Sequence, residues 1–411
     1  MKTAILIAGV AGALLSQSAQ SRVVPAWTAS QQATWGGDFL FPTNIPGVLK
    51  DRTLRQVVRL GIGGRDVRIA LSNTYGSRAV TVSGAHLAHS AGEGRILPAS
   101  DHVLRFGGET AVTIAPGATI LSDPVPMTVT AGQDLAVSFY FIETPIIESF
   151  HWDGKRTGYV FKGNQLTATA PPIAETTATR LLLASVLVDA PDAQGTVVIL
   201  GDSITDGAGA SLDTETRWPD YLAARAAPRH IAVVNAGISG ARLLSDGMGR
   251  NALARLDRDV LSQPGIRTLV VMLGINDIAW PGTPFDPQAP AATFEAIVAG
   301  YRAVVARAHA GGVRVIGTTL TPFAGALPGT PLAATYYNPA KDALRGRVNH
   351  WIRTSGTFDA VMDYDQILSD PKAPAHLAHA FDSGDHLHPG DAGNKAMADA
   401  IDLDTLIGTR P

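Results

Sequence analysis

The sequence predicts a three-layer α/β domain with a parallel sheet, preceded by an all-β sandwich or jelly-roll domain. Before residue 190, apolar and polar residues alternate with a period of two, which is typical of half-buried strands. After residue 195, short and almost continuously apolar runs alternate with helical patterns, as in parallel strands that are buried on both faces. With 411 residues, the chain is long enough for two or three domains.

Residues 22–190 carry the all-β pattern. Val67, Ile69 and Leu71 alternate with polar neighbours, and a similar alternation begins at Leu135. Glycine and proline turns recur between these runs at a spacing that suits a sandwich or jelly roll. We interpret the Thr-, Ala- and Pro-rich segment 167–179 as the exit from this domain, followed by a short polar connection over 190–195.

Residues 195–411 carry the α/β pattern. The candidate strands are 197–200, 231–235, 268–273, 313–319 and 360–363. Between two of them, Phe294, Ile297, Tyr301 and Val304 recur at helical spacing, which places Tyr301 in the core, and Gly311 ends the helix. Five strands joined by helical crossovers predict a sheet with helices on both faces.

Composition and the first residues limit the class of protein. A net charge of -3 and the lack of a basic run give no reason to expect a nucleic-acid partner. The absence of cysteine removes disulfides, thiolate nucleophiles and cysteine-bound zinc. Lys2, an apolar stretch over 4–15 and small residues up to 21 predict a signal peptide over 1–21. We therefore expect a secreted or periplasmic protein without stable membrane insertion, and the oligomeric state is left open.

A serine follows the first strand of the α/β part. The run 197–200 ends in Gly201-Asp202-Ser203, which puts Ser203 at the carboxyl end of a strand, where ligands bind in such sheets. We expect Asp202 to support this turn. The alternative is that Ser203 only caps the next helix.

A nucleophilic serine needs a base, a carboxylate that orients the base, and donors for the developing oxyanion. Asp385 and His388 are three residues apart near the C-terminus, so one tight turn can bring the carboxylate to the imidazole. Gly240 and Asn276 follow the second and third strands and can provide a backbone and an amide donor beside the N–H of Ser203.

These donors have plainer alternatives. Gly240 can be a turn residue and Asn276 a helix cap. We expect Asp277 to cap the helix after Asn276.

These blocks, in this order, resemble the SGNH, or GDSL-type, serine hydrolase superfamily, including its members with an N-terminal β domain. Ser203, Gly240, Asn276 and His388 fall on the Ser, Gly, Asn and His that give the superfamily its name, and Asp385 falls in its Asp-x-x-His element. The resemblance extends from residue 195 to about residue 406.

The resemblance implies a flavodoxin-like fold and an ester hydrolase that needs no cofactor and no metal. Ser203 would be the nucleophile, His388 the base and Asp385 its orienting carboxylate, with an oxyanion hole from Ser203, Gly240 and Asn276. Two positions depart from the pattern: Ile204 stands where the name-giving Leu would be, and Ala241 where many relatives have Asn.

Other residues allow further interpretations. Asp382, Asp385, His386 and His388 can be read as a zinc cluster instead of part of a catalytic set. Arg217 and Trp218 are candidates for lining the cleft, although a buried Trp at a helix start is the commoner case. His151 and Trp152 are candidates for reaching across from the β domain, with core packing as the simpler expectation for Trp152.

The expected function is hydrolysis of short-chain acyl esters by a secreted serine esterase. The loops at the strand ends are rich in Gly, Ser and Asp, and no long apolar lid follows the signal peptide, so we expect a shallow polar cleft and a preference for acetyl and butyryl groups. Acetylated carbohydrate is the favoured substrate, by analogy with β-sandwich modules alone. The alternatives are a lipase or aryl esterase, an acyltransferase with the same residues, and a non-catalytic polysaccharide-binding protein.

Overall fold

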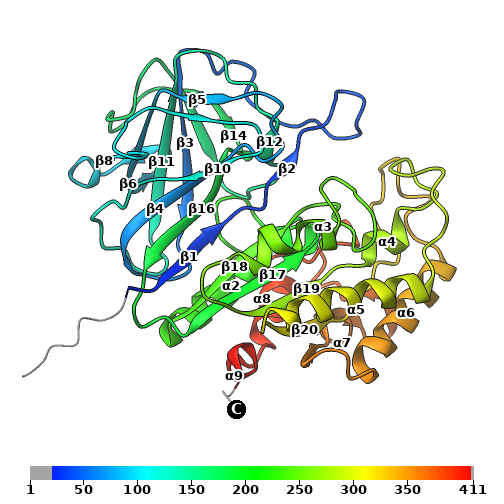
Figure 1. The fold of residues 1–411 in the computed structure, drawn as a ribbon. Coiled ribbons are helices and arrows are strands. Elements are labelled where there is room, and N and C mark those ends of the chain that lie inside the picture. The colour runs from blue at the N-terminus through cyan, green and yellow to red at the C-terminus, as the bar shows by residue number, and fades with distance from the viewer. Residues whose placement is uncertain (1–20, 409–411) are drawn as a thin grey trace, which may run out of the picture.

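The computed structural model describes residues 21–408, in which an all-β part is followed by an α/β part that lies beside it (Figure 1). The predicted signal peptide falls on residues outside this range, apart from Ser21. Across 21–408, no helix combines the length and the apolar character that a membrane span requires.

Two antiparallel sheets form most of the β part, as expected for an all-β sandwich. The first has the order β1-β16-β4-β10. Its strands are β1 (Val23–Thr28), β16 (Leu183–Asp189), β4 (Arg65–Ser72) and β10 (Thr119–Leu121). The second has the order β14-β13-β3-β11-β6-β7, with β8 paired to β6. Its strands are β14 (Ile173–Thr177), β13 (Gly158–Lys162), β3 (Arg52–Arg59), β11 (Asp134–Phe141), β6 (Gly84–Gly92), β7 (Arg95–Ile96) and β8 (His102–Val103).

The core of the β part contains the side chains that alternate in the sequence. Val67, Ile69 and Leu71 of β4 are completely buried in one apolar cluster, together with Leu135 and Val137 of β11. Shorter strands complete this part of the chain. They are β2 (Gln32–Ala33), β12 (Ser149–His151) and β15 (Arg180–Leu181) in one small sheet, the pair β5 (Val80–Val82) and β9 (Val112–Ile114), and the single turn η1 (Pro98–Ser100).

The segment 167–179 does not lead out of the β part, so this prediction was wrong. Its residues 173–177 form β14, which pairs with β13 at one edge of the larger sheet. The chain then returns through β15 and β16 to the two other sheets. Threonine suits an edge strand with one face in water, and the same composition is common in linkers.

The α/β part contains a five-stranded parallel sheet of order β18-β17-β19-β20-β21. The strands are β17 (Gly195–Gly201), β18 (Ile231–Gly237), β19 (Ile266–Met272), β20 (Arg314–Thr318) and β21 (Ala360–Met362). All five predicted strands are confirmed, with ends that differ by a few residues. The first strand lies between the second and third, which is the flavodoxin-like order, and the carboxyl ends of these three strands meet at one edge.

Helices cover both faces of this sheet and give three layers (Figure 1). Val198 and Leu200 of β17 belong to an apolar cluster with α5 (Phe294–Ala310) and α6 (Pro339–Thr354). Val197 and Ile199 point to the opposite face and join α2 (Trp218–Ala226) and α8 (Asp391–Asp399). The remaining elements are α1 (Ser203–Asp206), η2 (Ala227–Arg229), α3 (Ala252–Leu256), η3 (Asp257–Leu261), α4 (Ile275–Ala279), α7 (Tyr364–Leu368), β22 (Ser369–Asp370), β23 (Ala373–Leu377) and α9 (Leu403–Ile407).

The helix around Tyr301 confirms the sequence prediction. Thr293 caps α5 by accepting a hydrogen bond from the N–H of Ala296, and Gly311 follows its last turn. Tyr301 is buried and donates its hydroxyl to the carbonyl of Leu273. Tyr301 is therefore a core residue.

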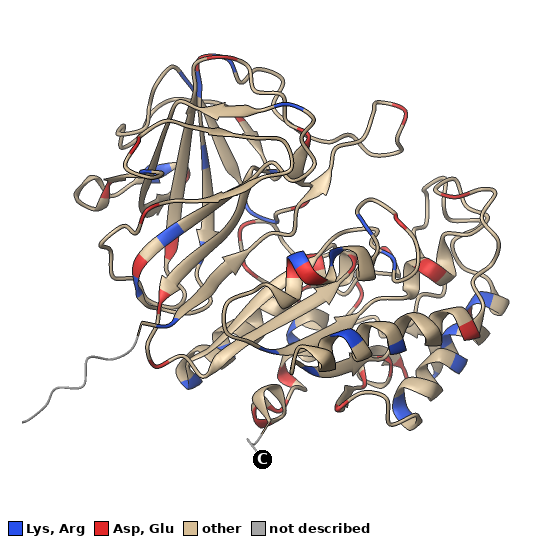
Figure 2. Cartoon of the chain, in the orientation of Figure 1, with Lys and Arg blue, Asp and Glu red and all other residues tan. Residues whose placement is uncertain are grey.

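The β part and the α/β part share a packed boundary. Strand β1 runs beside β18 (Figure 1), and Thr28 Oγ1 donates to the carbonyl of Asn235 over 2.8 Å. Gln32 Nε2 donates to the carbonyl of Met248 over 2.7 Å. Figure 2 shows basic and acidic residues interspersed over both parts of the ribbon.

Candidate active site

Ser203 is presented by a sharp strand-to-helix turn. β17 ends at Gly201, and a Cβ at Gly201 would lie only 2.1 Å from Thr205 Oγ1, so glycine allows the close approach of strand and helix. Ser203 is the first residue of α1, while Asp202 occupies the cap position and accepts from the N–H of Ile204 over 3.0 Å. The alternative of Ser203 as a cap is therefore wrong, and Asp202 supports the turn as predicted.

Asp385 and His388 lie in the loop between β23 and α8. The carboxylate of Asp385 accepts from the N–H of His388 over 2.8 Å and from the N–H of Leu387 over 3.0 Å. Its second oxygen lies 2.6 Å from Nδ1 of the His388 ring. Although burial opposes ionisation, these hydrogen bonds and the His388 ring hold the pKa of the Asp385 carboxyl well below its usual range.

The structure brings these two residues to Ser203. Nε2 of His388 lies 2.8 Å from Oγ of Ser203, across 185 residues of sequence. Because the Asp385 carboxylate can only accept a hydrogen bond, Nδ1 of His388 carries the proton and Nε2 can accept from the serine hydroxyl. The three side chains form a continuous relay from carboxylate to hydroxyl.

Asn276 lies within α4 and does not cap this helix, because Gly274 holds the cap position. Its Nδ2 donates to the carbonyl of Ala241 over 3.0 Å, and its Oδ1 accepts from the hydroxyl of Tyr336 over 2.7 Å. These two bonds fix the orientation of the amide and leave the second hydrogen of Nδ2 for another acceptor.

Gly240 is held in a conformation that favours glycine. Its φ is +70°, and a Cβ there would lie 2.7 Å from Sδ of Met248 and 2.9 Å from Cζ2 of Trp280. Within residues 21–408, no hydrogen-bond acceptor faces the backbone N–H of Gly240 or that of Ser203. Both groups can therefore donate to a bound molecule.

Asp277 does not cap α4, so this prediction was wrong. Its carboxylate accepts from the N–H groups of Leu243 over 2.7 Å and Leu244 over 2.8 Å and so holds the chain that follows Gly240. Burial raises the pKa of Asp277 to about 6. Because Asp277 lies inside α4, its side chain reaches the neighbouring loop more readily than the N–H groups at the N-terminus of α4.

Asp202 is a second buried carboxyl beside the site. It is 1% exposed, and burial raises its pKa to about 7 although the N–H of Ile204 donates to it. The side chains of His388 and Asp277 act on it in opposite senses, the first favouring its charge and the second opposing it.

The four candidate zinc ligands form two separate pairs. Nδ1 of His386 pairs with Asp382 at the surface, while His388 pairs with Asp385 and faces Ser203. Among the residues that the structure describes, no three His, Asp or Glu side chains gather in a way that could hold a metal ion.

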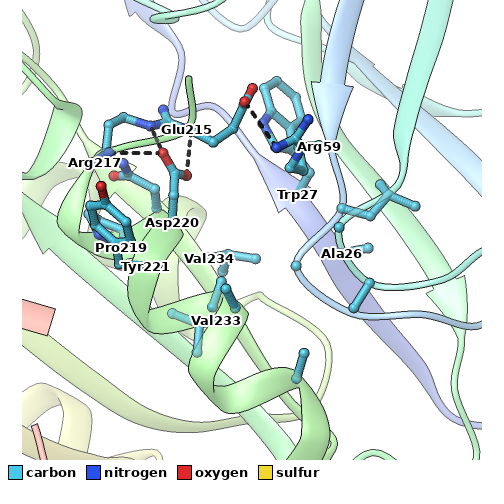
Figure 3. A pocket seen from close by; sticks show the side chains of 18 of the residues that line it. Ala26, Trp27, Arg59, Glu215, Arg217, Pro219, Asp220, Tyr221, Val233 and Val234 are labelled. Atoms are coloured by element: carbon cyan, nitrogen blue, oxygen red, sulfur yellow. Dashed lines mark hydrogen bonds and ion pairs between the residues drawn. The ribbon is translucent and has the colours of Figure 1, made fainter. Parts of the chain in front are cut away.

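Arg217 and Trp218 lie at the start of α2, and the Arg217 side chain packs against Gly207, directly after α1. Trp218 is completely buried at the start of α2, which is the commoner case of a buried Trp at a helix start. Arg217 binds the carboxylate of Asp220 through two nitrogens over 2.7 and 2.8 Å. It lines a cavity of about 380 Å³ between β1 and β3 on one side and α2 and β18 on the other (Figure 3). Ser203, His388 and Asn276 are not among the lining residues, so this cavity is separate from the candidate active site.

His151 reaches the α/β part and Trp152 packs at the boundary. The Nε2 atom of His151 lies 2.9 Å from Oδ1 of Asp206 in α1. Trp152 is partly buried in an aromatic cluster with Trp35 and Phe41.

The sequence did not reveal that Tyr336 would hold the Asn276 amide. Tyr336 lies in a loop without a recognisable pattern, so no signal in the sequence pointed to it.

Comparisons with known proteins support the assignment of the α/β part. Residues 197–401 match the family model described as GDSL-like lipase/acylhydrolase. No curated protein matches the chain.

Several solved structures are similar to part of the chain. They include an acetyl xylan esterase (19% identity, covering 50% of this chain and 96% of that chain, TM-score 0.37). A second is a catalytic mutant of an acetylxylan esterase from Geobacillus stearothermophilus (24% identity, covering 53% of this chain and 96% of that chain, TM-score 0.37). A third is a GDSL-like lipase from Bacteroides thetaiotaomicron (21% identity, covering 50% of this chain and 85% of that chain, TM-score 0.36).

Proposed function

Since this chain belongs to the GDSL-like lipase/acylhydrolase family through residues 197–401 and is a carboxylic ester hydrolase, we propose that Ser203, His388 and Asp385 carry out its reaction. The observation that carries this proposal is the relay of 2.6 Å from Asp385 to Nδ1 of His388 and 2.8 Å from Nε2 to Oγ of Ser203. The reaction is hydrolysis of an acyl ester through an acyl-enzyme intermediate.

In the first half of the reaction, Ser203 Oγ attacks the acyl carbon and its proton moves to Nε2 of His388. The negative charge on the carbonyl oxygen is stabilised by the N–H groups of Ser203 and Gly240 and by Nδ2 of Asn276. His388 then gives its proton to the leaving alkoxide, and the alcohol departs. Asp385 stabilises the imidazolium that exists between these two steps.

In the second half, water replaces the alcohol. His388 takes a proton from the water, the resulting hydroxide attacks the acyl carbon, and the same donors stabilise the second oxyanion. The bond to Ser203 Oγ breaks, His388 returns the proton to Oγ, and the carboxylic acid leaves.

The substrates that we propose are short-chain acyl esters, with acetylated carbohydrate as the favoured natural class. Over residues 195–408, the large apolar side chains classed as exposed are Leu212 and Val361. Two such side chains do not make an extended apolar surface for a long acyl chain, whose further methylenes would forgo about 0.8 kcal/mol each by staying in water. We propose that the protein is exported, on the basis of Lys2 and the apolar stretch over 4–15.

The Ser203→Ala variant tests the catalytic proposal. With p-nitrophenyl acetate, we expect turnover to fall by roughly 10³- to 10⁶-fold while the far-UV spectrum and the melting temperature stay close to those of the wild type. Turnover near that of the wild type would refute the role of Ser203.

A ladder of p-nitrophenyl esters from acetate upward, beside acetylated oligosaccharides, tests the substrate range. We expect the highest kcat/KM for acetate and butyrate and release of acetate from the sugars. A kcat/KM that climbs steadily to long chains, without acetate release, would indicate a lipase instead.

A further inference from the structure

One side chain of the β part reaches into the turn that carries Ser203. His151 ends β12 and is 3% exposed, and Asp206 ends α1 and is 1% exposed. Nε2 of His151 lies 2.9 Å from Oδ1 of Asp206. This contact joins the two parts of the chain three residues after Ser203.

The partners of His151 determine its protonation. Nδ1 lies 2.9 Å from the carbonyl oxygen of Ser30, which can only accept a hydrogen, and Nε2 faces a carboxylate, which also only accepts. Both ring nitrogens therefore carry hydrogen, and the ring is an imidazolium. Burial opposes its charge, yet Asp206 raises the pKa of His151 above its usual value.

Asp206 also holds the loop that contains Gly240. Its Oδ2 accepts from the N–H and from the hydroxyl of Ser239, each over 2.8 Å. Ser239 directly precedes Gly240. A single carboxylate thus connects the helix of Ser203 to one of the donors of the proposed oxyanion hole.

The other charged groups near His151 do not compensate its positive charge in place of Asp206. Arg217, at the start of α2, opposes the positive charge on His151, and its own guanidinium is bound by Asp220. Arg180 stands opposite His151 in the pairing of β12 with β15. Asp206 is therefore the carboxylate that compensates the imidazolium.

We propose that His151 is a positioning residue for the esterase reaction: as an imidazolium it fixes the carboxylate of Asp206, which aligns Ser203 with the N–H of Gly240. This inference rests on the proposed function, because it assigns an effect on kcat to a residue that does not touch the substrate. It also gives the β part a role in catalysis beyond any binding of substrate.

The proposal predicts an alkaline limit to activity. When base removes a proton from the His151 ring, one nitrogen loses its hydrogen and faces an acceptor, either Asp206 or the carbonyl of Ser30. The alignment of α1 with the loop of Gly240 is then lost. We expect kcat to fall at alkaline pH while KM changes little.

The variant Asp206→Asn tests this prediction while keeping an acceptor for Ser239 and a polar group opposite Nε2 of His151. The Asn carbonyl oxygen can still accept from Ser239, and the Asn amide can donate to Nε2 of a neutral His151, whose Nδ1 still donates to Ser30. We expect kcat near neutral pH within about 10-fold of the wild type. The alkaline decline in kcat should disappear.

His86→Gln is the matched control. His86 also pairs with a carboxylate, Asp101, over 2.9 Å, but both residues belong to the β part: His86 lies on β6 and Asp101 directly follows η1. We expect its kcat and its alkaline decline to equal those of the wild type. A second variant, His151→Gln, removes the charge on the other side of the pair and should lower kcat by roughly 10- to 100-fold with KM within about twofold.

The double variant Asp206→Asn with His151→Gln separates positioning from a general loss of folding. It replaces the charged pair by a neutral one, so kcat should recover part of the loss seen in His151→Gln. An unchanged alkaline decline in Asp206→Asn, or a wild-type kcat in His151→Gln, would overturn the inference. If either result occurs and the Ser203→Ala variant is inactive, the inference about His151 fails but the proposed function stands. If the Ser203→Ala variant is active, the proposed function itself is refuted.

Discussion

At the scale of single residues, the candidate site depends on side chains whose orientation is fixed by buried partners. Asn276 is 2% exposed, and its amide is held between the carbonyl of Ala241 and the hydroxyl of Tyr336. A donor that is already oriented loses little entropy when the oxyanion forms. Tyr336 therefore helps to orient the Asn276 amide, and this amide is the group that donates to the substrate.

Removal of the Asn276 amide should slow the chemical step. For Asn276→Ala we expect kcat to fall by roughly 10²- to 10³-fold with little change in KM, because an oxyanion donor acts mainly in the transition state. Tyr336→Phe keeps the amide and loses one of its two anchors, so its kcat should fall by only roughly 2- to 10-fold. Steady-state kinetics on a p-nitrophenyl ester measures both, and an unchanged kcat in Asn276→Ala with a lower melting temperature would contradict the oxyanion role.

Asp202 makes stability depend on pH. In the unfolded chain its carboxyl loses its proton near pH 4, whereas burial keeps the folded carboxyl protonated up to a pKa of about 7. Unfolding therefore releases a proton between these values, and raising the pH across this window favours the unfolded state. Asp202→Asn keeps a cap acceptor and has no carboxyl to ionise.

We expect the melting temperature of Asp202→Asn to exceed that of the wild type by more at pH 8 than at pH 5. Thermal unfolding followed by circular dichroism at the two pH values measures this difference. A difference that is the same at both pH values would show that Asp202 does not carry a raised pKa.

At the scale of elements, the sequence predicted the strands well because each is a short apolar run followed by a turn. It also predicted the relay, since Ser203, Asp385 and His388 stand at strand ends or in one tight turn. It failed for Asp277, which resembles a helix cap in sequence but bonds to Leu243 and Leu244 in a neighbouring loop. Long-range partners of this kind leave no periodic pattern in the chain.

The loop after β18 has a steric requirement at Gly240. For Gly240→Ala we expect a loss of about 1–3 kcal/mol in the free energy of unfolding beyond the backbone strain, because the new methyl group would overlap with Met248 and Trp280. Gly282→Ala is the matched control, since Gly282 also has a positive φ, of +76°, and nothing lies within 4 Å of a Cβ there. Urea denaturation compares the two, and equal losses would contradict the close packing of Gly240.

At the scale of the whole molecule, the boundary between the two parts contains buried polar contacts as well as aromatic packing. Gln32 and His151 of the β part reach Met248 and Asp206 of the α/β part. The sequence suggested a contribution from His151 across this boundary, but its partner could not be derived, because five strands of unknown relative position, β13 to β17, lie between His151 and Asp206. The wrong prediction for segment 167–179 has a different cause: β14 pairs with the preceding strand β13, but its Thr-rich composition is also common in linkers.

This boundary predicts that the two parts unfold together. Breaking it would separate His151 from Asp206 and expose the aromatic cluster around Trp152 to water, which is costly in proportion to the apolar area exposed. Differential scanning calorimetry should therefore show one transition at pH 7. Two separate transitions for the intact chain would contradict a shared cooperative unit.

The central claim is that Ser203 is a nucleophile activated by His388, and active-site labelling tests it most directly. The protein is treated with an organophosphate, digested, and the modified peptide is identified by mass spectrometry. We predict one equivalent of label on Ser203, with loss of activity in proportion to labelling, and no label in Ser203→Ala. A fully active protein that takes up no label, or label on another residue with loss of activity, would contradict the account.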